Sequence, residues 1–445
     1  MQRLRPTRSV LDIARRLEAA GFEAWCVGGA IRDALLGGHP LDWDLATQAH
    51  PEQVRDIFGR KRTIPVGIEF GTVSVLDDAG VAHEITTFRR DVKTDGRHAV
   101  VEFGASLDDD LARRDFTINA IAYRPRTDEV RDPFDGRGDI ERGVVRAVGD
   151  AEERMREDRL RALRAIRFAS RFHFDIEPGT LAAIRSSAPY LTRLSAERVQ
   201  QEMVKTMEQV ERPGIAFRLW RDTGALAVLV PTLATISDVA LATIDALPRA
   251  SVGGRTLPQR TSNRLAALFL DVSPAEVRPA LVALRFSKHE TTWVATLVER
   301  WAWLGAELSA VLPTRAPSDE EVRRWLSRIG RLYAGAFLRV ALARWSAMRA
   351  AGVAAPNDSA VQSLHRRMRQ SLYRDPLEVA DLQVGGDDLR RAGIRAGPIY
   401  AKILHALLDF VLADPARNTP EALLAEVPAL AKALGEGTPT SHTQG

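Results

Sequence analysis

Residues 22–46 read FEAWCVGGAIRDALLGGHPLDWDLA and contain the pattern that decides the fold. The apolar run 22–27 predicts a short strand, and the glycine pair 28–29 behind it predicts a tight turn. Residues 30–36 predict a short helix that a second glycine pair closes. Residues 41–46 alternate as a second strand does. A strand, a glycine turn, a helix and a strand with two aspartates therefore follow one another directly.

The two aspartates, Asp42 and Asp44, are candidate metal ligands. Residues two apart on a strand project from the same face, so we expect their carboxylates side by side. Two like charges held close together are costly unless a cation shares them. Two hard oxygen ligands with open positions suit Mg²⁺, which keeps water and phosphate oxygens as its other ligands. Glu84 is a candidate third carboxylate, although a lone glutamate on a strand is equally typical of a solvated face.

The glycine turn is a candidate binding site for a triphosphate. The backbone N–H groups of Gly28 and Gly29 can approach phosphate oxygens closely, and Arg32 lies one turn into the following helix. A glycine pair or an Asp-x-Asp pattern is weak evidence alone, because both are common at protein surfaces. Their ordered combination is more specific.

The elements around this stretch predict a small mixed sheet. A helical pattern over 9–20 precedes it, and strand patterns over 62–66, 71–76 and 81–88 follow, with a hairpin turn at 77–80. Beyond about residue 150 the alternation nearly disappears and helical periodicity dominates. The fold class is therefore α+β, a small mixed-sheet head followed by an all-helical remainder. The predicted helices of the remainder are 151–171, 195–210, 213–223, 259–270, 287–303, 318–349, 397–413 and 419–433.

The segment RRDFTINA, residues 113–120, places two arginines beside an aspartate. Arg114 with Asp115 offers several donors and one acceptor, a set that suits phosphate together with ribose hydroxyls. The alternative is a helix start with Asp115 as its N-cap and an apolar run behind it. Both interpretations are compatible.

The segment 154–171 carries seven arginines against two acids. On one continuous helix, Asp158, Arg161 and Arg164 would lie along one face. An ion-paired, solvated face is one interpretation. The other is a base reader, in which an aspartate accepts from an exocyclic amine while a neighbouring arginine donates to the adjacent ring acceptor. Such a pair would accept C and A and reject U and G, because the wrong bases leave buried polar groups unpaired.

The amino-acid composition limits the classes of protein and of site that are possible. The 445 residues include 62 Lys and Arg, of which 56 are Arg, and the formal net charge is +4. A GC-rich genome explains most of this arginine excess, and recognition of phosphates by guanidinium groups is the functional alternative. The single cysteine excludes intramolecular disulfides and a four-cysteine zinc site. We expect a cytoplasmic protein, because no run of 18 apolar residues occurs and the N-terminal segment predicts an amphipathic helix.

In order along the chain, the motifs GGAIRD, DWDLAT, TIPVGIEFGTVSVL, EITTFRRD, RRDFTINAIAY, DPFDGRGDI, REDRLRALRAIRF and SAERVQQEM resemble those of the class II tRNA nucleotidyltransferases. These are the bacterial and eukaryotic CCA-adding enzymes of the DNA-polymerase-β-like superfamily. The resemblance covers about residues 8–210, and a looser one covers 381–404. It implies template-independent addition of C, C and A to the tRNA 3′ end from CTP and ATP, with release of pyrophosphate.

The resemblance also implies roles for individual residues. Asp42 and Asp44 would hold Mg²⁺ with Glu84 in support, and the residues of the glycine turn would hold the triphosphate. The implied ligands of the ribose and phosphates are Arg114, Asp115 and Asn119. The implied amino-acid template for base selection comprises Glu157, Asp158 and Arg161, with Arg164 and Arg167 as further nucleotide contacts.

The domains implied are a catalytic head (1–145), a helical neck with the base-selecting helix (146–212), a helical body (213–350), a tRNA-binding tail (351–435) and a disordered end (436–445). The segment 91–103 resembles the family's basic flexible loop, which is associated with the final A addition. No His-Asp doublet occurs, so we expect no metal phosphohydrolase module. The expected partners are tRNA, ATP and CTP, with no membrane and no obligate protein partner.

Three alternatives remain. One is an enzyme that adds only the terminal A and works with a separate CC-adding enzyme. Another is a poly(A) polymerase, which shares the head motifs, although TIPVGIEFGTVSVL is similar to the CCA-adding branch. The last is a non-catalytic RNA-binding relative, against which the intact Asp42 and Asp44 pair argues.

Overall fold

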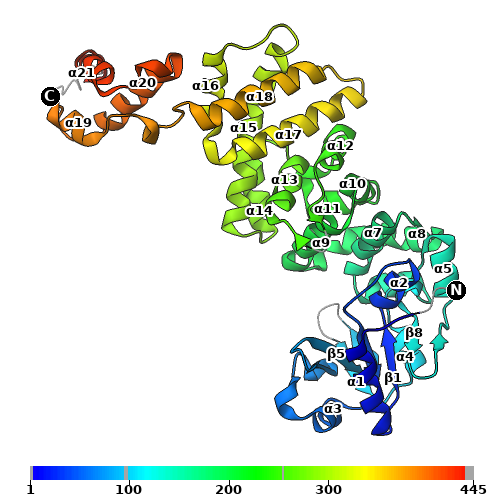
Figure 1. Cartoon of the computed structure of the whole chain (residues 1–445). Coiled ribbons are helices and arrows are strands. Elements are labelled where there is room, and N and C mark those ends of the chain that lie inside the picture. Colours follow the sequence, from blue (N-terminus) through cyan, green and yellow to red (C-terminus); the bar gives the residue numbers. More distant parts are fainter. Residues whose placement is uncertain (1–3, 95–98, 253–254, 436–445) are drawn as a thin grey trace, which may run out of the picture. The chain divides into compact units, whose positions relative to one another are not determined.

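Residues 4–94, 99–252 and 255–435 are described by the structure, a computed structural model of the chain (Figure 1). Two expectations fall on other residues. The tip of the predicted basic loop, residues 95–98, and the predicted disordered end, residues 436–445, lie outside the described part.

The chain divides into two units. The first contains the residues up to Thr235 together with 283–285, and the second contains 236–282 together with the residues from Phe286 onward. This division is coarser than the predicted head, neck, body and tail, and each unit is considered by itself. The α+β fold class is confirmed, because strands concentrate in the first unit and helices fill the rest.

A mixed sheet forms the centre of the first unit. Among the described residues it has seven strands in the order β3-β4-β5-β2-β1-β8-β9. The neighbours β2 and β5 run parallel, and the other neighbouring pairs run antiparallel. The strands are β1 (Ala24–Val27), β2 (Asp44–Thr47), β3 (Thr63–Ile64), β4 (Thr72–Leu76), β5 (Ala82–Thr87), β8 (Ala122–Arg124) and β9 (Glu129–Arg131).

The central strand β1 is buried on both faces. Ala24 and Cys26 belong to one apolar cluster, and Trp25 and Val27 belong to another. Successive side chains of a strand point to opposite faces, so a continuous apolar run is what a doubly covered strand requires. The burial on both sides holds the glycine turn after β1 in place.

Short strands and helices complete the first unit (Figure 1). The strands β6 (Arg89–Thr94) and β7 (Ala99–Phe103) pair antiparallel, and β10 (Val144–Val145) pairs parallel with β11 (Asp175–Ile176). The helices are α1 (Arg8–Ala19), α2 (Gly29–Leu35), α3 (Pro51–Phe58), η1 (Arg60–Arg62), η2 (Ile68–Phe70), α4 (Leu107–Ala112), η3 (Thr117–Asn119), α5 (Gly136–Arg142), α6 (Ala151–Glu157), α7 (Leu160–Phe172), α8 (Pro178–Ser187), η4 (Ala188–Arg193), α9 (Ala196–Gln209), α10 (Pro213–Asp222), α11 (Ala225–Leu229) and η5 (Pro231–Leu233).

The prediction of one helix over 151–171 is wrong, because the chain breaks between α6 and α7. Asp158 is extended, with φ −143° and ψ 105°. Its Oδ1 accepts a hydrogen bond from the backbone N–H of Leu160 at 3.0 Å. Short polar side chains compete in this way with helical hydrogen bonds, so Asp158 favours a new helix start.

The second unit is helical apart from the short strands β12 (Ser251–Val252) and β13 (Arg255–Thr256), as far as its residues are described. The predicted single helix over 318–349 is also wrong, since Gly330 separates two helices there. None of the described helices combines the length and the apolar character needed to span a bilayer. The helices are α12 (Asp238–Ala246), α13 (Pro258–Leu268), α14 (Pro274–Ala283), α15 (Lys288–Val311), α16 (Asp319–Ile329), α17 (Arg331–Ala350), α18 (Asp358–Arg374), η6 (Val379–Asp381), α19 (Gly386–Arg391), α20 (Ile399–Ala413), η7 (Pro415–Arg417) and α21 (Pro420–Gly435).

Candidate functional site

A cavity of about 440 Å³ in the first unit brings together most of the predicted site residues. Its wall is formed by residues of the turn after β1, of α2, β2, η3 and the chain before it, α7 and α9. Nine predicted residues line it, namely Gly28, Gly29, Arg32, Asp44, Arg114, Asp115, Asn119, Arg164 and Arg167. Four further residues line it that sequence reasoning missed, namely Phe168, Arg171, Lys205 and Gln209.

The glycine turn requires glycine at its first position. Gly28 has a φ of +79°, a backbone conformation that residues with a Cβ rarely adopt. A Cβ built there would lie 3.1 Å from Nη1 of Arg114 and 3.8 Å from Oδ2 of Asp44. The backbone of the turn therefore lies directly beside an arginine and an acid of the cavity, where a phosphate chain can approach it.

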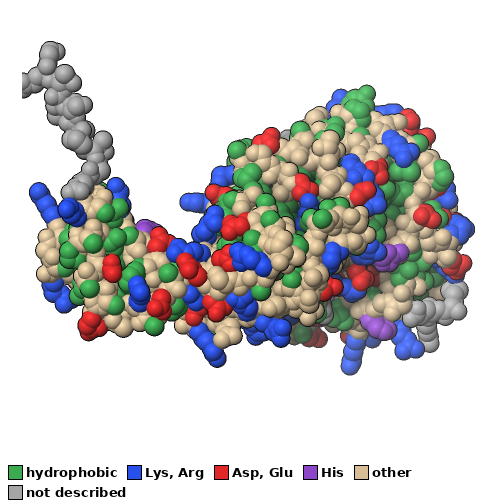
Figure 2. Space-filling model, turned by 90° about the horizontal axis from the view of Figure 1, so that it is seen from above, with side chains coloured by type: hydrophobic (Ala, Val, Ile, Leu, Met, Phe, Trp, Pro, Cys, Tyr) green, Lys and Arg blue, Asp and Glu red, His purple; other side chains and the backbone are tan. Residues whose placement is uncertain are grey.

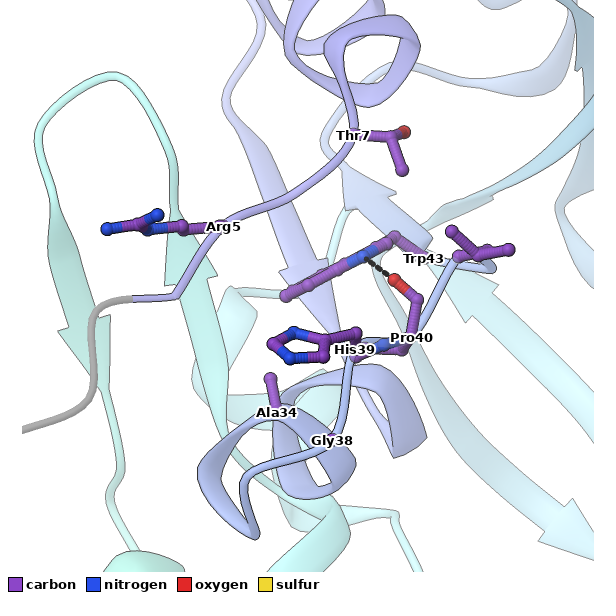
Figure 3. Close-up of a pocket in the computed structure, with 8 residues that line it drawn as sticks. Arg5, Thr7, Ala34, Gly38, His39, Pro40 and Trp43 are labelled. Carbon is purple, nitrogen blue, oxygen red and sulfur yellow. Dashed lines mark hydrogen bonds between the residues drawn. The ribbon is translucent and has the colours of Figure 1, made fainter.

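Trp43 anchors the two candidate metal ligands. Its indole is buried at 1% exposure, and its Nε1 donates to the carbonyl of Pro40 at 2.9 Å (Figure 3). The strand β2 begins only at Asp44, so the expectation that Asp42 lies on the strand is wrong. The alternation still holds, because Asp42 and Asp44 are exposed on either side of the buried tryptophan.

Glu84 lies next to this pair in the sheet. The register of β2 with β5 places Leu45 opposite Ile85, so Asp44 and Glu84 precede paired residues on neighbouring strands. Both are exposed, whereas Leu45 and Ile85 are buried. Although the residue is exposed, partial desolvation of the Asp44 carboxyl by neighbouring protein atoms, together with repulsion by Asp42 and Glu84, raises its pKa to about 6. The carboxylates are thus near enough to repel one another, as ligands of a shared cation do.

A hydrogen-bonded chain of buried side chains forms one wall of the cavity. Arg32, only 5% exposed, donates from Nη1 to Oδ1 of Asn119 at 2.5 Å and from Nη2 to Asp33 at 2.7 Å. Asn119 donates from Nδ2 to Oδ1 of Asp115 at 2.8 Å. The second oxygen of Asp115 accepts from Nε and Nη2 of Arg164 at 2.8 and 2.7 Å.

This chain keeps Asp115 ionised. Burial alone would raise the pKa of Asp115. The Arg164 guanidinium and the Asn119 amide outweigh this effect and hold the pKa of Asp115 below its ordinary value. The two hydrogen bonds that Arg164 donates to one oxygen of Asp115 also fix the direction in which the carboxylate points. Asp115 is therefore a rigid acceptor in a cavity otherwise rich in donors.

Phe168 supports three of the cavity arginines. The Cζ atoms of Arg32, Arg164 and Arg167 lie 4.9, 5.2 and 4.4 Å from the centre of its ring. Stacking on an aromatic ring orients a guanidinium without using its N–H donors. Helical periodicity placed Phe168 on the apolar side of α7, which is why the sequence did not mark it as a site residue.

The helix α9 supplies the other missed residues. Lys205 and Gln209 line the cavity, and Glu202 lies on the same helical face at the spacing i, i+3, i+7. Arg167 donates from Nε to Glu202 at 2.5 Å and from Nη1 to Gln209 at 2.9 Å. The polar face of this helix was the available signal, since Lys205 is one of six lysines in the chain.

The residues of the implied base-selecting template do not line the cavity. Asp158 accepts from Arg198 at 2.7 Å, whereas Arg161 donates to Glu157 at 2.7 Å and to the carbonyl of Arg113 at 3.0 Å. The break before α7 removes Asp158 from the helical face that carries Arg161, so the single-face arrangement predicted from the sequence is wrong. The three residues lie at the α6–α7 junction, one turn from Arg164.

The cavity is suited to a polyanion. Six basic side chains line it against two acids, Asp44 and Asp115. Guanidinium groups held by neighbours in fixed directions are pre-organised to bind phosphate oxygens. The acidic end, near Asp44, is where a divalent cation and the reacting phosphate would meet.

Comparisons with known proteins agree with this geometry. The Poly A polymerase head domain family matches residues 24–146, and the family described as "Probable RNA and SrmB- binding site of polymerase A" matches residues 173–236. The CCA-adding enzyme of Latilactobacillus sakei is 36% identical over 416 residues, covering 93% of this chain and 96% of the relative. That of Geobacillus kaustophilus is 35% identical and covers 94% and 96%. A crystal structure of the Bacillus stearothermophilus CCA-adding enzyme in complex with CTP, 31% identical, superposes with a TM-score of 0.72 over 97% of this chain and 99% of that chain.

Proposed function

The chain belongs to the CCA-adding enzymes, and we propose that the cavity lined by the glycine turn, Asp115 and the α7 arginines is its nucleotide site. The reaction is the addition of C, C and A to the 3′ end of tRNA from CTP and ATP, with release of pyrophosphate. The observation that carries the assignment of the site is the convergence of a glycine turn, Asp44 and six basic side chains on one cavity. Since the substrate is tRNA, we place the activity in the cytoplasm.

The donor set fits a divalent cation. The family uses divalent metals, and we propose Mg²⁺ held by Asp42 and Asp44, with Glu84 as the supporting carboxylate. The raised pKa of Asp44 supports this, because desolvation and then repulsion by Asp42 and Glu84 disfavour its ionised form, a cost that a bound cation would offset. No group of three metal-ligating side chains is close enough to bind a metal unaided among the described residues. When bound, Mg²⁺ activates the attacking hydroxyl and neutralises charge on the phosphates.

The protein's own groups position the reactants. The Gly28–Gly29 backbone and the guanidinium groups of Arg32 and Arg114 hold the triphosphate, so that the 3′-hydroxyl of the RNA attacks the α-phosphate in line. Asp115 and Asn119 bind the ribose hydroxyls. Arg164 and Arg167 act as further phosphate contacts, and no covalent enzyme intermediate is needed.

Base selection is assigned to Glu157, Asp158 and Arg161. In the described structure their polar atoms are engaged by protein partners, Arg198 for Asp158 and Glu157 for Arg161. We propose that base edges replace some of these partners, so that an acid accepts the exocyclic amine of C or A while an arginine donates to the ring acceptor. U and G would leave both groups unpaired.

The remaining proposals concern the division of the chain into domains and the role of one loop. The head (1–145), neck (146–212), body (213–350) and tRNA-binding tail (351–435) are proposed as subdivisions of the chain, and the body spans the boundary between the two units at Thr235. The segment 91–103 is proposed as the loop needed for A addition.

Three tRNA transcripts test the reaction, one ending before CCA, one at C and one at CC, each incubated with CTP, ATP or both. We expect all three to be extended to CCA when both nucleotides are present. Extension of only the CC-ended transcript would indicate an A-adding enzyme instead. A homopolymer tail made from ATP alone would indicate a poly(A) polymerase, and no extension of any transcript would indicate a non-catalytic relative.

A further inference from the structure

A second polar cavity, of about 420 Å³, lies in the first unit and shares no lining residue with the nucleotide cavity. It is formed by α6, the chain just before α7, α8 and η4. Its lining residues are Glu152, Met155, Arg156, Arg159, Ala183, Ser186, Ser187, Tyr190 and Arg193. None of the residue roles proposed above involves it.

The arginines of this cavity differ in ion pairing from the arginines that lie near them in the sequence. Of the seven arginines between Arg154 and Arg171, five form ion pairs with carboxylates. The other two, Arg156 and Arg159, both line this cavity together with Arg193. Within the described residues no ion pair is formed by any of these three, so their charges are not neutralised by the protein.

Arg159 is held in place but keeps unused donors. Its Nη1 donates to Oγ of Ser187 at 3.0 Å, while its Nε is buried without an acceptor. The guanidinium carbons of Arg159 and Arg193 lie 4.9 and 5.4 Å from the ring centre of Tyr190, which is 48% exposed. Burial and the repulsion of Arg193 and Arg156 lower the pKa of Arg159. Three cations gathered around one cavity without a salt-bridge partner among the described residues favour the binding of an anion there.

We propose that this cavity binds a backbone phosphate of the RNA substrate through Arg156, Arg159 and Arg193, with Tyr190 orienting two of the guanidinium groups. This rests on the proposed function, which supplies the RNA. The cavity has one acid, Glu152, and no glycine turn or acid pair, so it lacks the features that hold a metal-bound triphosphate in the other cavity. Ser186, Ser187, Tyr190 and Arg193 also fall within residues 173–236, the segment similar to the RNA-binding family.

The test is the salt dependence of tRNA binding by the full chain. Binding of a transcript lacking CCA is measured by fluorescence anisotropy between 50 and 300 mM KCl for wild type, Arg159→Gln and the double variant Arg156→Gln/Arg193→Gln. Loss of one phosphate contact should raise Kd for tRNA about 5- to 10-fold and reduce the slope of log Kd against log salt by about 0.7 to 0.9. Arg156 and Arg193 are exposed, so the double variant tests the proposal even if Arg159→Gln does not fold.

Two further variants distinguish an effect of this particular cavity from a general effect of positive charge at the protein surface. Arg185→Gln removes an exposed arginine of α8 that does not line the cavity, and we expect it to leave tRNA binding unchanged. Arg193→Lys keeps the charge and should retain the salt slope. A slope in the double variant equal to that of wild type, or an equal loss in Arg185→Gln, would overturn the proposal.

Calorimetric titration with CTP and with inorganic pyrophosphate distinguishes RNA from free anions. We expect both affinities to be unchanged in the double variant, and a loss equal to that for tRNA would make the cavity a free-anion site and overturn the RNA assignment. Failure of wild type to extend any tRNA would refute the proposed reaction while leaving the binding comparison intact. Normal extension by wild type with unchanged tRNA binding by the variants would refute only the phosphate site.

Discussion

At Asp44, folding and cation binding make opposite demands on one carboxylate. Its raised pKa of about 6 means that the ionised form costs folding free energy when no cation is present. The same charge is what a divalent cation needs as a ligand. Neutralising this side chain should therefore stabilise the metal-free fold and remove the activity.

Asp44→Asn is expected to raise the metal-free Tm by about 1 to 3 °C and to lower kcat by about 10³-fold or more. Thermal denaturation at pH 8 in EDTA and in Mg²⁺ measures the first effect, and single-nucleotide incorporation measures the second. Mg²⁺ should raise the Tm of wild type but not of the variant. Asp78→Asn, which changes an acid with a 97% exposed side chain, is the control. A lower metal-free Tm in Asp44→Asn would contradict the account.

Arg164 shows why arginine and lysine are not interchangeable in this cavity. Its Nε and Nη2 both donate to one oxygen of Asp115, an arrangement that needs the fixed donor fork of a guanidinium and that a lysine ammonium cannot supply. Arg164→Lys should lower kcat/KM for CTP about 10- to 100-fold. Arg15→Lys, at a helix position 72% exposed, is the matched control and should change nothing. Equal kinetics for wild type and Arg164→Lys would show that charge alone suffices.

At the scale of elements, single residues decide where helices end. Gly330 separates α16 from α17 with a φ of +77°, a conformation that glycine adopts without strain. Gly335 lies inside α17 and has ordinary helical geometry, and a Cβ there would make only a normal contact, 3.7 Å from Nη1 of Arg339. The two glycines are five positions apart and should respond oppositely to the same substitution.

Gly330→Ala should destabilise the second unit by about 1 to 2 kcal/mol, because alanine is strained at positive φ. Gly335→Ala should stabilise it by up to about 1 kcal/mol through helix propensity. Urea denaturation followed by circular dichroism measures both. If both variants lost stability equally, crowding around α17 rather than backbone conformation would be responsible.

For the molecule as a whole, the arginine excess is explained mostly by arginines outside the two cavities, whose side chains pair with acids of the protein. Basic and acidic side chains are interspersed over the face shown in Figure 2. Many arginines pair with a nearby acid, as Arg315 does with Glu321 and Arg113 with Asp110. An exposed pair such as Arg315 with Glu321 contributes little stability, so genome composition suffices to explain arginines of this kind. The arginines that line the two cavities differ, because they are gathered around a space that can hold a ligand.

The two units should unfold in separate transitions, since each has its own core. CTP with Mg²⁺ should stabilise only the first unit, by about 2.7 kcal/mol at 100 times its Kd. Differential scanning calorimetry measures this, and Gly330→Ala identifies the transition of the second unit. A single transition, or an equal shift of both by CTP, would contradict the assignment of the nucleotide site to the first unit alone.

Much of the fold and of the site could be predicted from local patterns. The strand, glycine turn, helix and Asp-x-Asp order of residues 22–46 was confirmed, and nine predicted site residues line one cavity. The helix breaks at Asp158 and Gly330 were missed. In each case apolar periodicity continued across the break, while one side chain or one positive φ ended the helix.

The sequence by itself determined the motif order, the fold class and the family, because strand alternation, glycine turns and paired acids are properties of neighbouring residues. Only the tertiary structure decided which side chains of the site pair with one another. Arg32 meets Asn119 across 87 positions, Arg164 meets Asp115 across 49, and Asp158 pairs with Arg198 rather than with Arg161. Contacts between segments so far apart depend on how helices pack on the sheet, which no local pattern encodes. The same packing gathered three arginines around the second cavity that form no ion pair with the described residues.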